Sequence, residues 1–287
     1  AIALNADPNK QREEHAPQSD LNALLPLMQM RNMVGYLYGS EDISLLFYAL
    51  IRREKPQNLI ELGTGVGGTA LWMAHACKEN GSGKVWTIDD GSQWQDVAHF
   101  RTAMMPLSTV PPFNQIDFNT VTYVEFMQQA IQLLDLGPHL EFMPVHLELD
   151  SGLKLDPDKY PFMRTPWDFL FLDINRMPDH ILDILHQFLP RMGPWGSIFI
   201  DSASTSAVSF LFLENLVTQL NAGKVPRRFL NEPDAEWRRQ LFDAVAAHRF
   251  TLMHLVERLQ REQNSTAWLK IEPNDYVPHP DALMKWV

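Results

Sequence analysis

Apolar and polar positions follow one another along the chain in a repeating order of short strands and helices. Apolar residues recur at helical spacing over 21–33 and 43–53, ahead of a first buried strand. Apolar runs that predict strands then alternate with stretches of helical spacing. The predicted strands are 58–61, 84–88, 140–145, 167–172 and 196–200, and the predicted helices are 69–77, 124–136 and 178–192. Strands that alternate with helices predict a parallel, doubly wound α/β sheet.

The C-terminal part departs from this order. Two more helices are predicted at 209–220 and 235–248, and two β-prone segments at 250–259 and 265–271. The polar break between these segments, 260–264, is so short that they must pair antiparallel. We therefore expect a mostly parallel, seven-stranded, Rossmann-like sheet with an antiparallel last strand.

The chain divides into a short N-terminal part and one large domain. Residues 1–40 are interpreted as a polar arm with a helix, and residues 41–287 as the domain. Residues 91–122 do not fit the strand–helix order, and so long a loop is typical of an inserted lid or a binding loop. A surface excursion with a small core of its own is the alternative. Residues 203–249 form the second departure, interpreted as a helical cap or an oligomer contact.

Composition restricts the function classes. The chain has 287 residues, 45% of them hydrophobic, but no apolar run approaches the ~20 residues of a membrane span. The net charge of −11 opposes binding to phosphate backbones, so we expect neither a membrane nor a nucleic-acid partner. A single cysteine excludes an internal disulfide and indicates the cytoplasm. Because the chain does not begin with Met, we also consider a processed chain or a domain of a larger biosynthetic enzyme.

A glycine-rich turn follows the first predicted strand of the sheet. Gly63, Gly65 and Gly68 satisfy the dinucleotide pattern G-x-G-x-x-G, and Asp89 ends the next strand, where a ribose-binding acid is expected. This pattern fits NAD and S-adenosylmethionine (SAM) equally, and glycines that serve only a tight turn are a third reading. Glu61, two residues before the first glycine, favours SAM, because a carboxylate suits the ammonium group of methionine and would repel a pyrophosphate.

The segment Glu61-Leu-Gly-Thr-Gly-Val-Gly-Gly68 resembles motif I of class I SAM-dependent methyltransferases, and the order of elements over about 40–272 resembles their fold. Residues 167–173 and 196–202 are similar to the catechol and caffeoyl-CoA type of small-molecule O-methyltransferases. The resemblance implies contacts of Glu61 with the methionine end, of Asp89 with the ribose and of Glu148 with the adenine edge. The whole implied cofactor site is Glu61, Gly63, Thr64, Gly65, Gly68, Thr69, Asp89, Asp90, Glu148 and Asp173.

The same resemblance implies a divalent cation, Mg²⁺ or another, at the ends of the fourth and fifth strands. Asp173 and Asp201 lie 28 residues apart and match two ligand positions. Ser202 stands where the family has Asn, and Arg176 stands where it often has a lysine base. Arginine stays protonated, so Arg176 cannot be a base, although it could steady a developing oxyanion. The alternative is that the two aspartates form turns or contact the acceptor directly.

Without a metal, another group must accept the proton, and histidine is suited to this at neutral pH. His99 and His146 are candidates, beside Asp173, Arg176 and Asp201 as catalytic residues. We expect SAM-dependent O-methylation of a small-molecule or carrier-protein-bound natural-product intermediate, by an enzyme that could form a homodimer. The alternatives are a metal-independent methyltransferase with a histidine base directed at O, N or C, an NAD-dependent oxidoreductase, and a non-catalytic protein of the methyltransferase fold.

Overall fold

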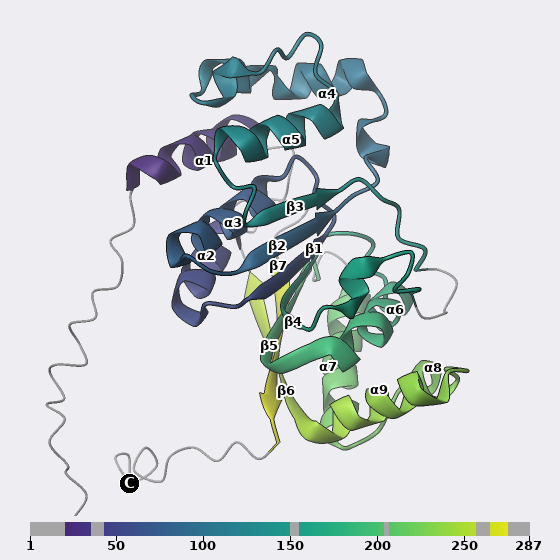
Figure 1. Cartoon of the computed structure of the whole chain (residues 1–287). Coiled ribbons are helices and arrows are strands. Elements are labelled where there is room, and N and C mark those ends of the chain that lie inside the picture. Colours follow the sequence, from purple (N-terminus) through teal and green to yellow (C-terminus); the bar gives the residue numbers. More distant parts are fainter. Residues whose placement is uncertain (1–20, 36–42, 150–154, 204–206, 257–264, 275–287) are drawn as a thin grey trace, which may run out of the picture.

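The computed structural model describes residues 21–35, 43–149, 155–203, 207–256 and 265–274, around one seven-stranded sheet (Figure 1). The strands are β1 Asn58–Leu62, β2 Lys84–Ile88, β3 Leu140–Met143, β4 Trp167–Leu172, β5 Met192–Asp201, β6 His248–Val256 and β7 Ser265–Pro273. Their order in the sheet is β3-β2-β1-β4-β5-β7-β6. Every strand pair is parallel except the two that involve β7. The predicted doubly wound sheet with an antiparallel last strand is confirmed.

Helices cover both faces of this sheet, with α1, α2, α3 and α5 on one side and α6, α7 and α9 on the other (Figure 1). The α-helices are α1 Leu21–Val34, α2 Ile43–Glu54, α3 Gly68–Asn80, α4 Val97–Met104, α5 Tyr123–Leu133, α6 Pro178–Phe188, α7 Ala207–Asn221, α8 Arg227–Leu230 and α9 Ala235–Ala247. The 3₁₀ helices are η3 Ser92–Trp94, η4 Met105–Thr109, η5 Phe113–Gln115, η6 Pro161–Arg164 and η7 Leu189–Arg191. Within the described part of the chain, every helix falls short of the length and apolar character that crossing a membrane requires.

Alternate side chains of the parallel strands enter two buried clusters, one on each face of the sheet. Leu59 and Phe169 belong to the cluster under α1, α2, α3 and α5, whereas Ile60 and Leu170 belong to the cluster under α6, α7 and α9. Phe47 of α2 packs edge-on against Phe169, with ring centroids 5.0 Å apart. Burial on both faces explains why these strands are continuous apolar runs in the sequence rather than alternating ones.

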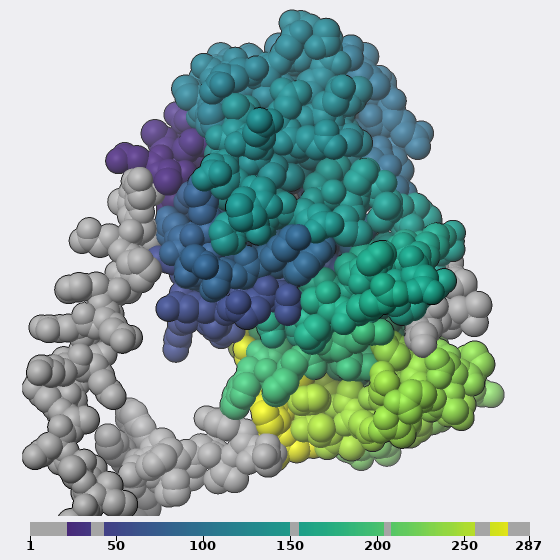
Figure 2. Space-filling view, in the orientation of Figure 1, coloured from purple at the N-terminus to yellow at the C-terminus, as the bar shows by residue number. Residues whose placement is uncertain are grey.

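The segment 91–122 is more regular than the irregular loop that the sequence predicts. It contains α4, η3, η4 and η5, and in Figure 2 it forms the upper end of the molecule. Helix α4 starts at Asp96, whose carboxylate accepts hydrogen bonds from the NH groups of Ala98 and His99. The large side chains of the segment share the cluster of α3 and α5; among them are Trp94, Phe100, Leu107, Phe113 and Phe118.

Two predicted boundaries are wrong by four residues, and some predictions cannot be compared. The helix predicted over 178–192 ends at Phe188, because the 3₁₀ turn η7 with Pro190 follows it. Strand β5 then begins at Met192 instead of residue 196, and its register against β4 shifts near that end. The polar arm at 1–20 and the break at 260–264 lie outside the described residues.

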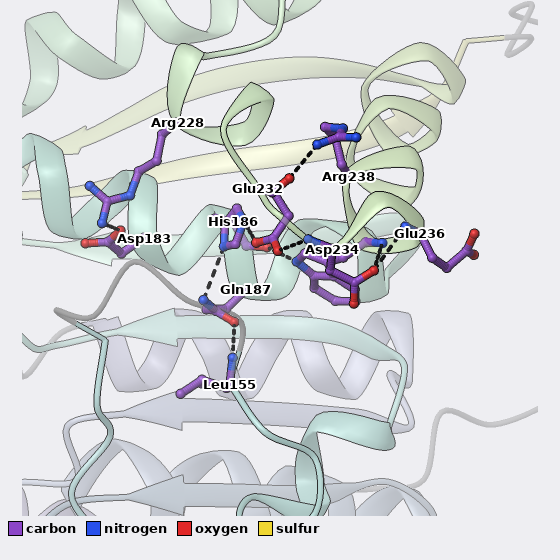
Figure 3. A network of polar contacts seen from close by, with 10 residues as sticks. Leu155, Asp183, His186, Gln187, Arg228, Glu232, Asp234, Glu236 and Arg238 are labelled. Carbon is purple, nitrogen blue, oxygen red and sulfur yellow. Dashed lines mark hydrogen bonds and ion pairs between the residues drawn. The ribbon is translucent and has the colours of Figure 1, made fainter.

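A buried polar network joins α8 and α9 to α6 (Figure 3). His186 Nε2 lies 2.7 Å from the carboxylate of Glu232, and both side chains are almost fully buried. Arg228 pairs with Asp183, and Gln187 accepts a hydrogen bond from the backbone of the 155–160 segment. Burial lowers the pKa of His186, although Glu232 opposes this. These contacts hold α8 and the segment before α9 against α6, while the division of the chain into arm, lid and cap stays a prediction.

Candidate active site

The glycine turn connects β1 to α3 at the carboxyl edge of the sheet. Gly63, Gly65 and Gly67 have φ values of 95°, 55° and 81°, a region that glycine occupies without strain. A Cβ atom at Gly63 would lie 2.2 Å from the carbonyl oxygen of Asp173, whereas a Cβ atom at Gly68 would meet nothing within 4 Å. The turn therefore passes directly against the end of β4, and glycine is required at its first position for two separate reasons.

Asp89, which follows β2, fixes this turn. One of its carboxylate oxygens accepts hydrogen bonds from the NH groups of Thr64 and Gly65, each 3.0 Å long. The other accepts a bond of 2.7 Å from the NH group of Gly91. Burial raises the pKa of Asp89, although these three bonds oppose the shift. A carboxylate has about four lone-pair sites, so Asp89 holds the turn and keeps acceptor capacity for a ligand hydroxyl.

Glu61 carries a buried carboxylate at the same edge. Its side chain accepts a hydrogen bond of 2.5 Å from the hydroxyl of Thr87, and the Thr64 hydroxyl lies 2.6 Å from that of Thr87. Burial raises the pKa of Glu61 well above its usual value, and the negative charges of Asp173 and Asp89 add to this effect. A cationic ligand group next to Glu61 would stabilise the ionised form and offset the cost of its burial.

A partly open pocket lies beside Glu61, and the space between its walls, including the part open to solvent, is about 620 Å³. The glycine turn and the end of β4 form one wall. Helix α1 forms the other, with Leu27, Met30, Arg31 and Val34. Trp72, Phe171 and the hydroxyl residues Ser44 and Thr69 complete the lining. The pocket thus combines the glycine turn and carboxylates on one side with a largely apolar surface on the other.

A cluster of charged side chains lies at the ends of β4 and β5. Arg176 Nη1 is 3.6 Å from an oxygen of Asp173 and 3.6 Å from an oxygen of Asp201. Ser202 Oγ donates a hydrogen bond of 2.5 Å to the same oxygen of Asp201. Burial and the charge of Asp201 raise the pKa of Asp173 to about 8, although Arg176 opposes the shift. Asp173 is the member of this cluster that also lines the pocket.

A family of proteins described as a methyltransferase domain matches residues 60–203, half of the chain. The chain belongs to this family. The match covers the glycine turn, Asp89, Asp173 and Asp201, but not the pocket wall that α1 forms. It decides between the two cofactors that the glycine pattern allowed: the protein is a class I SAM-dependent methyltransferase. The NAD-dependent alternative is thereby set aside.

Solved structures of three other methyltransferases are similar to this one. The O-methyltransferase TomG of Streptomyces achromogenes, involved in tomaymycin synthesis and solved with SAM, is 18% identical; the match covers 87% of this chain and 89% of that one, with a TM-score of 0.47. An O-methyltransferase of Bacillus cereus in complex with SAH is 14% identical over 86% and 90%, with a TM-score of 0.46. The SAH-bound Podospora anserina methyltransferase PaMTH1 is 12% identical over 96% and 99%, with a TM-score of 0.44.

No curated protein matches the chain. Because the three TM-scores are below 0.5, the family assignment rests on the domain match and not on these structures. The residues of the methyltransferase pocket fit SAM in one specific respect: the buried Glu61 carboxylate needs a cationic partner, and the ammonium group of the methionine moiety is one.

The methyltransferase pocket brings together six of the residues predicted to bind the cofactor, namely Glu61, Gly63, Thr64, Gly68, Thr69 and Asp173. Gly65 and Asp89 lie behind them and shape the turn. Asp90 and Glu148 have other partners at the surface, because Asp90 pairs with His146 at 2.8 Å and Glu148 with Lys159 at 2.7 Å. The contact of Glu148 with the adenine edge stays a prediction.

Neither candidate histidine base lines the pocket. His99 is exposed on α4, where its ring stacks on Trp94 with centroids 6.1 Å apart. The side chain of His146 is 71% exposed and is hydrogen-bonded to Asp90, whose pKa this bond lowers to about 2. The histidine-base alternative therefore gains no support from the structure, and Asp173 is the predicted catalytic residue that reaches the pocket.

Helix α1 is the part of the methyltransferase site that the sequence did not indicate. Its helical spacing predicted the helix, but nothing in that spacing shows where the helix packs. Leu27 and Met30 are buried against the cluster that contains Trp72, and both line the pocket. The one available signal was Arg31, a charged residue within a run of apolar ones.

Proposed function

We propose that this methyltransferase transfers the methyl group of SAM to an oxygen atom of a small molecule. The observation that carries the proposal is the pocket in which a carboxylate wall, with Glu61 and Asp173, faces the apolar side of α1. When bound, SAM supplies a methyl group on a cationic sulfur, which an acceptor atom can displace in line. Positioning of the reacting groups supplies much of the rate of such a reaction.

The residues of the pocket divide this task between them. Glu61 binds the ammonium group of the methionine moiety, and its buried position makes that contact strong. Asp89 holds the glycine turn through the NH groups of Thr64 and Gly65, and the turn itself lies against the rest of the cofactor. Leu27 and Met30 of α1 exclude water from the opposite side.

Asp173 is the group proposed to take the proton from the acceptor. It lines the pocket next to the glycine turn, and a pKa of about 8 lets it hold or release a proton near neutral pH. The acceptor hydroxyl gives its proton to this carboxylate while its oxygen gains the methyl group. Arg176, beside Asp173, is placed to stabilise the negative charge that develops on that oxygen.

The net charge of −11 and the apolar wall of the pocket support a small, largely apolar acceptor. The narrower form of the proposal is a natural-product intermediate, free or bound to a carrier protein.

The test is transfer of labelled methyl from SAM to a panel of phenols, catechols, aliphatic alcohols and amines. We expect labelled methyl ethers, at least tenfold more slowly from Asp173→Asn than from the wild type. Asp179→Asn, which changes an exposed aspartate at the start of α6, is the matched control and should keep the wild-type rate. Methylation of amines alone, or a wild-type rate from Asp173→Asn, would contradict the proposal.

A further inference from the structure

The ends of β4 and β5 place two carboxylates next to each other. In the parallel register Leu172 pairs with Ile200, and the next residue of each strand is an aspartate. The register of β4 against β5 therefore places Asp173 and Asp201 next to each other. The side chain of Asp201 is only 2% exposed, and Asp201 contributes to the raised pKa of Asp173. The side chain of Asp173 is 32% exposed, and a positive charge beside the two carboxylates would favour the ionised form of both.

Arg176 supplies that charge from the same chain. Its Nη1 atom lies 3.6 Å from one oxygen of each aspartate, so a single guanidinium nitrogen lies between the two carboxylates. The segment that carries it is held in place, because the backbone oxygen of Arg176 accepts a hydrogen bond of 2.7 Å from the buried hydroxyl of Ser209 on α7. The guanidinium is always charged, so the positive charge is permanent.

A divalent cation does not fit this arrangement. Mg²⁺ requires six oxygen ligands at roughly 2.0–2.1 Å in near-octahedral geometry, and it would need the carboxylate oxygens that face Arg176. Ser202 stands at the third expected ligand position, but its hydroxyl donates a hydrogen bond to the carboxylate of Asp201. Among the residues that the structure describes, no group of three or more His, Cys, Asp or Glu side chains could hold a metal ion. The metal ligands predicted from the sequence, Asp173, Asp201 and Ser202, are therefore not a cation site as they stand.

We propose that Arg176 permanently replaces the divalent cation between Asp173 and Asp201. The wild-type protein then binds no divalent cation at this place. This inference rests on the proposed O-methylation where it concerns the reaction, which then needs no divalent cation. Without a metal ion that must be coordinated by two oxygens of the acceptor, the acceptor needs only one hydroxyl and not a vicinal diol.

The proposal is tested by titrating Mn²⁺ into the wild type and into Arg176→Met, with free Mn²⁺ followed by electron paramagnetic resonance. We expect no binding by the wild type below millimolar concentration. In Arg176→Met the positive charge between the two carboxylates is lost. This variant should gain one Mn²⁺ site, with an affinity at least tenfold higher than that of the wild type. The double variant with Asp201→Asn should lose that site again.

Arg239→Met is the matched control, because Arg239 also pairs with two carboxylates, Glu236 and Asp243, but on the exposed surface of α9. It should gain no comparable site. One Mn²⁺ bound by the wild type and lost in Asp201→Asn would overturn the proposal, and this result does not require that any variant with a changed Arg176 folds. A folded Arg176→Met that binds no Mn²⁺ would overturn it as well.

These titrations need no acceptor, so they are independent of whether the proposed O-methylation is correct. Where an acceptor is methylated, the rate should be unchanged by EDTA, and a phenol with one hydroxyl should react as well as a catechol. Loss of activity in EDTA that Mg²⁺ restores would contradict the proposal. A complete absence of methyl transfer, in contrast, would count against the proposed function alone.

Discussion

Single residues determine the shape of the cofactor turn. Gly63 combines a positive φ with a close approach to the carbonyl oxygen of Asp173, whereas Gly68 is the first residue of α3 and has free space around it. The two glycines belong to one sequence motif, but only the first is required by the backbone. Replacing each of the two glycines by alanine therefore shows which of them the backbone requires.

We expect Gly63→Ala to lower the free energy of unfolding by at least about 1–3 kcal/mol, the usual cost of a strained backbone, because its methyl group must displace the end of β4. Gly68→Ala should leave the free energy of unfolding unchanged or raise it by about 0.5–1 kcal/mol, since alanine is favoured in a helix. Urea denaturation of both variants measures the difference. Equal stability of the two would contradict the close approach described here.

Most residues of the site could be identified from the sequence, but their arrangement could not. Glu61, Gly63 and Asp173 follow from the glycine motif and from strand ends, which are local features. The position of Arg176 between two aspartates depends on the register of β4 against β5, a contact between segments far apart in the chain. The pairing of Asp90 with His146, which comes from the end of another strand, could not be predicted for the same reason, and a contact of Asp90 with the cofactor stays a prediction.

Elements with a clear pattern were predicted well. β2 and β4 have the predicted bounds, since strands buried on both faces are mostly apolar and lie between polar turns. The interior of 91–122 was not predicted, because its apolar residues are spread over three short 3₁₀ turns and one helix without a single period. The position of α1 over the pocket could not be predicted either. An apolar stripe shows that a helix is buried, but it does not show which elements the helix packs against.

The covering of the pocket by α1 leads to a prediction for two methionines of this helix. Met30 is 2% exposed and lines the pocket, whereas Met28 is 44% exposed on the outer side. Met30→Lys should weaken SAM binding at least tenfold, about 1.4 kcal/mol, because the new ammonium group faces a cationic cofactor. Met28→Lys should bind SAM as the wild type does.

Calorimetric titration of SAM into both lysine variants measures this difference, with thermal unfolding recorded in parallel. Met30→Leu, which keeps the apolar volume, should retain most of the affinity and so separate a loss of binding from a loss of folding. Equal affinities for Met30→Lys and Met28→Lys would show that α1 does not cover the cofactor.

At the scale of the whole molecule, the sheet brings the chemistry to one edge. Asp89 and Asp173 follow β2 and β4, and Asp201 is the last residue of β5, so all three lie at the carboxyl ends of parallel strands, where ligands of this architecture bind. The two layers of helices differ in their role. Helices α1, α2 and α3 contribute residues to the pocket, whereas on the other face the buried pair of His186 and Glu232 fixes α8 and α9 to α6. The fold thus follows from the order of elements, while the function depends on which residues occupy this edge.

The most direct test of the account is a calorimetric titration of SAM and, separately, of NAD⁺ into the wild type and Glu61→Gln. We predict that the wild type binds one SAM and no NAD⁺, and that Glu61→Gln binds SAM at least tenfold more weakly, about 1.4 kcal/mol, because it keeps the size of the side chain but loses its charge. Glu141→Gln, an exposed change on β3, should bind SAM normally. Binding of NAD⁺ in place of SAM, or an undiminished SAM affinity of Glu61→Gln, would contradict the account.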